Sequence, residues 1–325
     1  MVLSNEKYIR MLPEKDQQLV AEILRLKTEK DVLILAHNYQ RESVQLVADL
    51  LGDSLGLAKK VVNATQKNII FAGVRFMAET AKVLNTEKRI HFPAKGSLCK
   101  MASYLKADMI REYKKANPGI PVILYINSTA ESKTMADIVC TSSNAVKVVK
   151  FIKEQAKAPK FGFGPDKNLG AYVSKMTGIP VDIIPPDGNC YVHDMYSVND
   201  VQESKKEHPE AVILVHPEAP EDVLNQADYI GSTSMILNYP ENHPEVISYV
   251  IGTEIGVTER LRRMHPNKKF YPLNKKAVCF AMKKITLESI LECLKKIDTD
   301  EFVIELEQDV IDKSHDAIQK MIEIG

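Results

Sequence analysis

Three of the five cysteines stand at nearly constant spacing along the chain. Cys99 and Cys190 are 91 residues apart, and Cys190 and Cys279 are 89 residues apart. This spacing matches no zinc-finger or Cys-x-x-Cys pattern, and three thiolates leave a tetrahedral structural zinc ion without its fourth ligand. Three thiolates do suffice for a [4Fe–4S] cluster with one open iron, although four cysteines are the usual set. An open iron acts as a Lewis acid, so the spacing predicts a metal centre that takes part in catalysis.

Cys140 and Cys293 fall outside this spacing. We expect both to be core or near-surface thiols, because an unpaired cysteine most often packs as a small apolar residue. Five cysteines are an odd number and too few for a disulfide scaffold of 325 residues. With no secretory signal read at the N-terminus, we expect a cytoplasmic protein with reduced thiols.

Three short apolar runs end in polar residues. They are 32–37, 122–127 and 211–216, so that His37 and Asn127 are 90 residues apart and Asn127 and His216 are 89 apart. Runs of Val, Ile and Leu without alternation are typical of parallel strands buried on both faces. Ligands of open parallel sheets bind outside the carboxyl ends of the strands. The polar residues at or just beyond these ends, where a ligand would bind, are His37, Asn38, Tyr39, Tyr125, Asn127, His216 and Glu218.

Small hydroxyl residues follow each run, in the stretches 52–55, 140–143 and 231–234. Ser54 and Ser142 are 88 residues apart, and Ser142 and Ser232 are 90 apart. We predict that these residues begin helices, because Ser and Thr side chains accept hydrogen bonds from the free amides of a first turn. Helix N-termini attract carboxylates and phosphates, which makes Ser54, Ser142 and Thr233 candidate anion ligands. The alternative is that each hydroxyl only caps its helix.

The markers recur because one unit of about 90 residues is repeated three times. Strands that alternate with helices predict stacked α/β/α layers around a parallel sheet. We therefore expect three pseudo-symmetric three-layer α/β/α domains with parallel sheets around a pseudo-threefold axis, which brings the three spaced cysteines together. The predicted domains are residues 1–98, 99–189 and 190–279, with C-terminal helices in 280–325 joined to the first. A further helix is expected over 14–27, begun near Pro13.

Composition narrows the function. Lys plus Arg and Asp plus Glu each number 43, and the resulting net charge of zero argues against a nucleic-acid or membrane-surface binder. The longest strongly apolar runs are five or six residues, far short of a membrane span. His193, three residues after Cys190, is close enough to line a pocket beside the metal centre. The lysine pairs 268–269, 275–276 and 283–284 are expected on solvated faces.

The chain resembles the quinolinate synthases, in their short form without additional Cys-x-x-Cys pairs. The stretches that carry the resemblance are 36–40, 52–58, 125–131, 141–145, 164–170, 188–193, 216–218, 231–235 and 251–254. The resemblance implies condensation of iminoaspartate with dihydroxyacetone phosphate to quinolinate, phosphate and water, in NAD biosynthesis. It also implies a [4Fe–4S] cluster, small-molecule substrates and, as a partner, the enzyme that supplies iminoaspartate.

Roles for individual residues follow from the same resemblance. The implied cluster ligands are Cys99, Cys190 and Cys279. The implied substrate ligands are His37, Ser54, Tyr125, Asn127, Ser142, His216, Glu218 and Thr233. Tyr39, Glu218 and His193 would lie nearest to the proton transfers, because loss of two waters and ring closure require acid–base groups.

Two other interpretations fit parts of the pattern. A non-catalytic iron–sulfur or zinc sensor would account for the cysteines but leaves Tyr39, Glu218 and the anion sites without a purpose. A phosphosugar or amino-acid binding protein with structural cysteines would be colourless and metal-free when prepared without oxygen.

Overall fold

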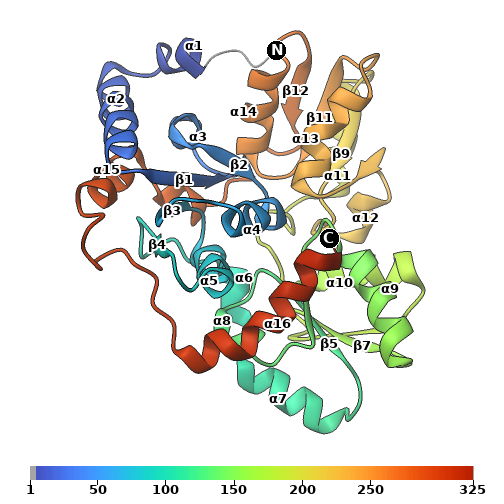
Figure 1. Cartoon of the computed structure of the whole chain (residues 1–325). Coiled ribbons are helices and arrows are strands. Elements are labelled where there is room, and N and C mark those ends of the chain that lie inside the picture. Colours follow the sequence, from blue (N-terminus) through green and yellow to red (C-terminus); the bar gives the residue numbers. More distant parts are fainter. Residues whose placement is uncertain (1–4, 325) are drawn as a thin grey trace.

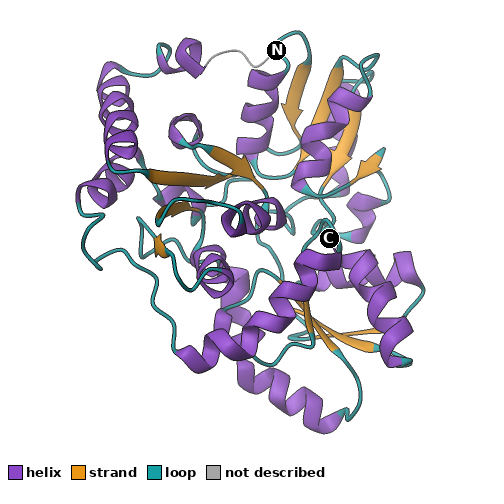
Figure 2. Cartoon of the chain, viewed as in Figure 1, coloured by secondary structure: helices purple, strands orange, loops and turns teal. Residues whose placement is uncertain are grey.

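The computed structural model describes residues 5–324. Three four-stranded parallel sheets share one strand order, in which the first strand of each unit lies between the second and third and the fourth forms an edge. Helices flank all three sheets, and the sheets form three separate lobes around the middle of the molecule (Figure 1, Figure 2). The predicted three-layer α/β/α architecture is therefore confirmed.

The first unit begins with two N-terminal helices and ends in a short edge strand. Its strands are β1 (Val32–His37), β2 (Leu50–Gly52), β3 (Asn68–Ala72) and β4 (Arg89–His91), and its helices are α1 (Asn5–Ile9), α2 (Glu14–Glu29), α3 (Glu42–Val47), α4 (Ser54–Val62) and α5 (Arg75–Leu84). The helix expected from Pro13 is α2, which Pro13 precedes as its N-cap residue.

The second and third units repeat this order. The second contains β5 (Val122–Tyr125), β6 (Ile138–Cys140), β7 (Phe161–Gly164), β8 (Val181–Ile183), α6 (Lys100–Tyr104), α7 (Ala107–Ala116), α8 (Ala130–Lys133), α9 (Ala145–Ala156) and α10 (Lys167–Thr177). The third contains β9 (Val212–Val215), β10 (Tyr229–Ile230), β11 (Ser248–Gly252), β12 (Lys269–Pro272), α11 (Val198–Glu207), α12 (Glu221–Leu224), α13 (Thr233–Asn242) and α14 (Ile255–Met264). Each sheet lies inside one of the residue ranges proposed above as domains.

The C-terminal tail bridges the first two units. It contains a 3-10 turn (Met282–Lys284), α15 (Leu287–Lys295) and α16 (Gln308–Ile324). Helix α15 packs against α2 of the first unit. Helix α16 contacts α5 of the first unit but also β6 and α8 of the second, so the tail is not confined to the unit that we expected it to join. Between these helices, the Phe92 amide donates to the Phe302 carbonyl at 2.7 Å, alongside β4.

The strands are buried as their unbroken apolar runs predict. Every residue of β5 and β7 is buried, and only the first residue of β3 and β11 is partly exposed. Burial on both faces requires helices on both faces, which is what the alternating connections supply. Within residues 5–324, no helix is both long enough and apolar enough to cross a membrane.

Candidate active site

An aspartate at the amino end of each central strand sets the register of the three units. The Asp49 carboxylate accepts from the Ile34 amide at 2.8 Å, and the Asp49 amide donates to the Ile34 carbonyl at 2.8 Å. The equivalent pairs are Asp137 with Val122 and Asp228 with Ile213, at 2.7 to 3.0 Å. These pairs identify the residues that occupy equivalent positions in the three sheets.

The register corrects one alignment made from the sequence. Counting three residues from each paired strand residue reaches His37, Tyr125 and His216, so Tyr125 and not Asn127 is the equivalent of the two histidines. Two residues further on stand Tyr39, Asn127 and Glu218. Each unit therefore places two polar side chains, separated by one residue, at the carboxyl end of its central strand. The boundary between apolar and polar residues misplaced the second unit, because β5 ends at Tyr125 whereas the apolar run continues through Ile126.

The small hydroxyl residues lie at or near helix starts as predicted. The prediction that they cap these helices is correct for Ser232 but wrong for Ser54, Ser142 and Thr233. Ser54 and Thr233 are the first residues of α4 and α13, and the residues before them, Asp53 and Ser232, are the caps whose side chains accept a helix amide. Ser142 lies ahead of α9, whose N-cap residue is Asn144. The three hydroxyls are thus not needed as caps, and all three line one pocket.

The three spaced cysteines occupy equivalent loops. In each unit, the first residue of a helix donates its amide to the carbonyl two residues before the cysteine. The pairs are Arg75 with Ser97, Lys167 with Gly188 and Ile255 with Ala277, at 3.0, 2.8 and 3.0 Å. Cys99, Cys190 and Cys279 are partly accessible from the pocket, whereas Cys140 and Cys293 are fully buried. The division of the five cysteines into pocket and core thiols follows the sequence prediction.

Asn38 is buried, accepts a hydrogen bond from Arg260 and does not line the pocket, whereas the other candidate site residues all line one pocket. They are His37, Tyr39, Ser54, Cys99, Tyr125, Asn127, Ser142, Cys190, His193, His216, Glu218, Thr233 and Cys279. Twelve of the thirteen come in threes, because each sheet contributes two strand-end residues, one small hydroxyl residue and the cysteine that follows its last strand. His193, three residues after Cys190, has no counterpart among them. The pocket therefore lies where the carboxyl ends of three parallel sheets face one another.

A chain of hydrogen bonds crosses the pocket wall. The Tyr39 hydroxyl lies 3.0 Å from the Thr233 hydroxyl and 2.9 Å from the Thr253 hydroxyl. Thr253 lies 2.9 Å from His193 Nε2, and His193 Nδ1 lies 2.9 Å from Glu218 Oε2. The chain connects a phenol of the first unit with a carboxylate of the third through buried polar groups.

The other oxygen of Glu218 accepts a hydrogen bond from the Tyr125 hydroxyl. His216, which stacks on His193 with ring centroids 4.5 Å apart, lies 3.1 Å from the Ser142 hydroxyl through Nε2. Side chains of all three units are thus joined around Glu218.

Burial controls the charge of these groups. It lowers the pKa of His37 to about 4 and that of His216 to about 3, so both imidazoles are neutral near pH 7. Burial, followed by the Glu218 charge, raises the pKa of Tyr39 and Tyr125 well above the ordinary phenol value. Burial by itself raises the pKa of Glu218, but His193, His216 and the hydrogen bond from Tyr125 outweigh it and keep the group ionised. The pocket wall thus holds the ionised Glu218 carboxylate beside the hydroxyl of Tyr125 and the imidazole of His193.

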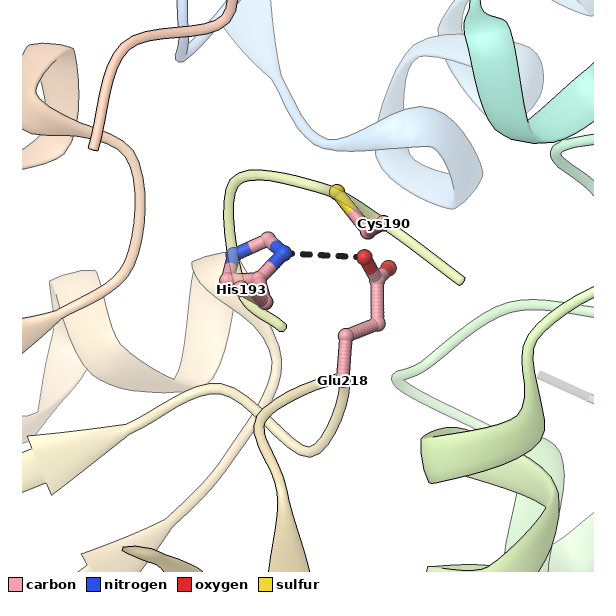
Figure 3. A group of neighbouring side chains, drawn as sticks. All are labelled: Cys190, His193 and Glu218. Carbon is pink, nitrogen blue, oxygen red and sulfur yellow. Dashed lines mark hydrogen bonds and ion pairs between the residues drawn. The ribbon is translucent and has the colours of Figure 1, made fainter. Parts of the chain in front are cut away.

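The pocket also contains a group of side chains able to hold a metal. The ligand atoms of Cys190, His193 and Glu218 lie within 4.8 Å of one another. Figure 3 shows these three side chains, with the contact between His193 and Glu218 dashed. Cys99 and Cys279 complete a thiol-rich wall. Burial raises the pKa of Cys99 to about 12, and the backbone amides of Ala102 and Met101 at the start of α6 oppose this shift. Such donors favour a thiolate, which is the form that binds a metal.

Several polar residues of the site were not predicted: Asp53, Thr141 and Ser143 line the pocket, and Thr253 and Lys283 contact residues that line it. Thr253 is fully buried and joins Tyr39 to His193, although in the sequence it is only one residue of a short matching stretch. Lys283 was expected on a solvated face, which is wrong: its ammonium lies 3.0 Å from a carboxylate oxygen of the fully buried Glu254 and donates to the Tyr39 carbonyl. In the sequence, Lys283 and Lys284 look like a solvated pair. Only the tertiary fold shows that Lys283 contacts Glu254 while Lys284 is exposed.

Comparison with known proteins gives one consistent result. A model of the family described as "Quinolinate synthetase A protein" matches residues 21–323. The quinolinate synthase of Thermotoga petrophila is 46% identical over 306 residues, which cover 94% of this chain and 99% of that protein. This chain belongs to the quinolinate synthase family. Quinolinate synthases of Pyrococcus abyssi and Thermococcus onnurineus are 45% and 43% identical, over 94% and 96% of this chain and 99% and 100% of theirs.

Membership of this family makes the chain an enzyme with small-molecule substrates. The family and the Cys190, His193 and Glu218 group together indicate a metal cofactor. The sequence resemblance stated above is thereby confirmed over nearly the whole chain.

Proposed function

We propose that this enzyme condenses iminoaspartate with dihydroxyacetone phosphate to give quinolinate, phosphate and two waters. The observation that carries the proposal is the convergence of four equivalent residues from each of three units on one pocket, in a chain of the quinolinate synthase family. Both substrates are anions, two carboxylates on one and a phosphate on the other. The neutral imidazoles of His37 and His216 and the pocket hydroxyls suit such substrates, because they donate hydrogen bonds to anions without adding charge of their own.

The substrate ligands are the polar residues at the strand ends and helix starts. We assign this role to His37, Ser54, Tyr125, Asn127, Ser142, His216, Glu218 and Thr233. Ser54 and Thr233 stand at the first residue of a helix, where free backbone amides add to the hydroxyl donor. The phosphate and the carboxylates are expected to face these two positions and Ser142.

Proton transfer is assigned to Tyr39, His193 and Glu218. Glu218 is ionised and accepts hydrogen bonds from Tyr125 and His193, so it is placed to take a proton from a substrate carbon or nitrogen. Tyr39 keeps its proton near pH 7 and is placed to donate it. Thr253 joins Tyr39 to His193 and completes a path along which a proton can return to Glu218.

We propose that the metal cofactor is a [4Fe–4S] cluster held by Cys99, Cys190 and Cys279. Sulfurs that share one zinc ion lie roughly 3.8 Å apart. Among residues 5–324, the three-residue group with ligand atoms within 4.8 Å is Cys190, His193 and Glu218, and not the three cysteines. Thiols that surround one pocket at wider spacing fit a multi-iron cluster better than a single ion. When bound, such a cluster supplies a Lewis-acidic iron for substrate carboxylate and hydroxyl groups.

The remaining proposals concern the cellular location of the enzyme and its partner. Five unpaired cysteines, three of them at the pocket, are compatible with a reducing compartment, and we propose a cytoplasmic enzyme. We further propose that the enzyme that makes iminoaspartate delivers it to this chain.

One experiment tests the proposed reaction. Protein prepared without oxygen is analysed for iron and sulfide per chain and assayed for quinolinate with both substrates. We expect about four irons and four sulfides, a brown colour and quinolinate formation. A brown protein without turnover would favour the sensor interpretation, and a colourless, well-folded protein that binds the substrates would favour the binding-protein interpretation.

A further inference from the structure

Two buried carboxylates lie behind the cysteines, outside the pocket. Asp166 and Glu254 precede α10 and α14 as N-cap residues, and both side chains are fully buried. Neither lines the pocket, and neither has a part in the reaction proposed above. A buried carboxylate is costly unless its oxygens are satisfied, so their hydrogen bonds indicate what they do.

Each carboxylate joins a helix start to a cysteine. One oxygen of Asp166 accepts from the Leu169 amide at 2.7 Å, and the other accepts from the Cys190 amide at 3.0 Å. Glu254 repeats the arrangement, with the Gly256 amide at 2.7 Å and the Cys279 amide at 3.1 Å. A simple cap needs one oxygen. The second oxygen in each case fixes the backbone of a cysteine that faces the pocket.

The cysteine loops are held tightly at the same place. A side chain on Gly188, two residues before Cys190, would bring its Cβ to 1.9 Å from the Pro165 carbonyl oxygen, next to Asp166. In the third unit, the contacts of Glu254 extend beyond the loop. Lys283 lies 3.0 Å from the Glu254 oxygen that accepts from Cys279, and donates to the Tyr39 carbonyl at 2.6 Å. The loop of one cysteine is thus tied to the backbone of a residue assigned to proton transfer.

The first unit lacks this arrangement. Its N-cap residue at the equivalent position is Val74, which has no carboxylate. Backbone amides lie near the Cys99 sulfur, those of Ala102 and Met101, and near the Cys279 sulfur, that of Met282. A buried carboxylate thus holds the backbone amides of Cys190 and Cys279, whereas Val74 offers none to Cys99.

We infer that Asp166 and Glu254 are positioning residues of the metal centre, which hold Cys190 and Cys279 in the geometry that ligates the cluster. This inference rests on the proposed ligation by the three cysteines. Residues that orient metal ligands typically contribute about 10–100-fold to metal affinity. They also tune the reduction potential, because hydrogen bonds to the sulfurs are among its determinants. A cysteine amide released from its carboxylate is free to donate toward sulfur, which favours the reduced cluster.

The variant Asp166→Ser separates the two roles of Asp166. Serine still caps a helix, but its single hydroxyl cannot also hold the Cys190 amide. In protein prepared without oxygen, we expect iron release to a chelator to be about 10–100-fold faster than in the wild type. We also expect the midpoint potential of the remaining cluster to move to more positive values. Glu254→Gln should change both quantities in the same direction.

The matched control is Asp228→Asn. Asp228 also accepts a backbone amide with its carboxylate, at 2.8 Å from Ile213, but at the amino end of the sheet. Its iron release and potential should equal those of the wild type. Circular dichroism identifies folded variants, and Asp166→Asn replaces Asp166→Ser in both measurements if the serine variant does not fold.

Three results would overturn the inference. They are iron release at the wild-type rate, an unchanged potential in Asp166→Ser and Glu254→Gln, or an equal effect in Asp228→Asn. Failure of the underlying ligation is recognised separately, because Cys190→Ser and Cys279→Ser would then keep their iron.

Discussion

The amino ends of the three sheets carry the same residue type at equivalent positions, whereas the carboxyl ends carry different ones. At the amino ends, Asp49, Asp137 and Asp228 make the same pair of backbone hydrogen bonds in every unit, at 2.7 to 3.0 Å. Each follows an alanine and precedes a short strand. One residue type performs one structural task three times, because each sheet needs the same connection there.

At the carboxyl ends, equivalent positions hold different chemistry. The two strand-end positions are occupied by His and Tyr in the first unit, by Tyr and Asn in the second, and by His and Glu in the third. Only the cysteine and a small hydroxyl residue are common to all three. The comparison indicates that the repeat supplies the positions, whereas the differences between units supply an asymmetric pocket for an asymmetric reaction.

Replacement of the pocket cysteines should have the largest effect. Cys99→Ser, Cys190→Ser and Cys279→Ser should each lose the cluster and all quinolinate formation, because an oxygen ligand is much poorer for iron than a thiolate. Cys140→Ser and Cys293→Ser should keep iron and colour, at some cost in stability from a buried hydroxyl. Iron per chain and visible absorption of the five anaerobic variants measure this. A bleached Cys140→Ser beside a brown Cys279→Ser would show that the threefold arrangement does not hold the metal.

Glu218→Gln should have the second largest effect on quinolinate formation. The amide keeps the shape of the side chain but cannot act as a base, and loss of one acid–base group typically lowers the rate by about 10²–10⁴-fold. Iron content and binding of an anionic substrate analogue should stay near the wild-type values, which the same preparation can show. Turnover close to that of the wild type would remove Glu218 from the mechanism and leave Tyr125 and Asn127 as the more important strand-end residues.

Thr233→Val tests the small hydroxyl that the three units share. Loss of one hydrogen bond to a charged group should weaken binding of a substrate or anionic analogue by roughly 1.5–3 kcal/mol. Because Ser232 and not Thr233 caps α13, the thermal stability should change little. Titration calorimetry gives the affinity. An unchanged affinity together with a lowered melting temperature would make Thr233 a structural residue.

The free energy of unfolding should change with pH because of the protonation of His37. Burial lowers its pKa to about 4, against 6.5 in the unfolded chain. The unfolded state therefore binds more protons between these values, and the free energy of unfolding falls as pH decreases from 6.5 toward 4. Between pH 7 and pH 5 this group contributes a loss of about 2 kcal/mol, which His37→Asn should remove. Urea unfolding of both proteins at the two pH values measures the difference, and equal losses would contradict it.

The sequence predicted most of the fold and most of the polar residues that line the pocket, because both depend on markers repeated along the chain. Short apolar runs and spaced cysteines are visible without the structure. What it could not supply is register: Tyr125 is the equivalent of His37 only once the Asp137 and Val122 pair aligns the strands. Single residues without counterparts in the other units, such as Thr253 and Lys283, carry no repeated signal and are placed by tertiary packing alone.

The repeated aspartates were themselves a signal in the sequence, since Ala-Asp precedes the second strand of every unit at spacings of 88 and 91 residues. Asp228→Asn should have the smallest effect and should complete the comparison. Asparagine can still accept a hydrogen bond from the Ile213 amide, so we expect a loss of about 1 kcal/mol in the free energy of unfolding. The turnover number and Michaelis constants should not change. The pocket lies at the carboxyl ends of the three sheets, whereas this hydrogen bond lies at the amino end of the third sheet. Urea unfolding tests the expected loss of stability, and steady-state kinetics on the same preparation test the expected unchanged turnover. If turnover falls while stability holds, the amino ends contribute to the reaction, and the separation of structural and chemical ends is wrong.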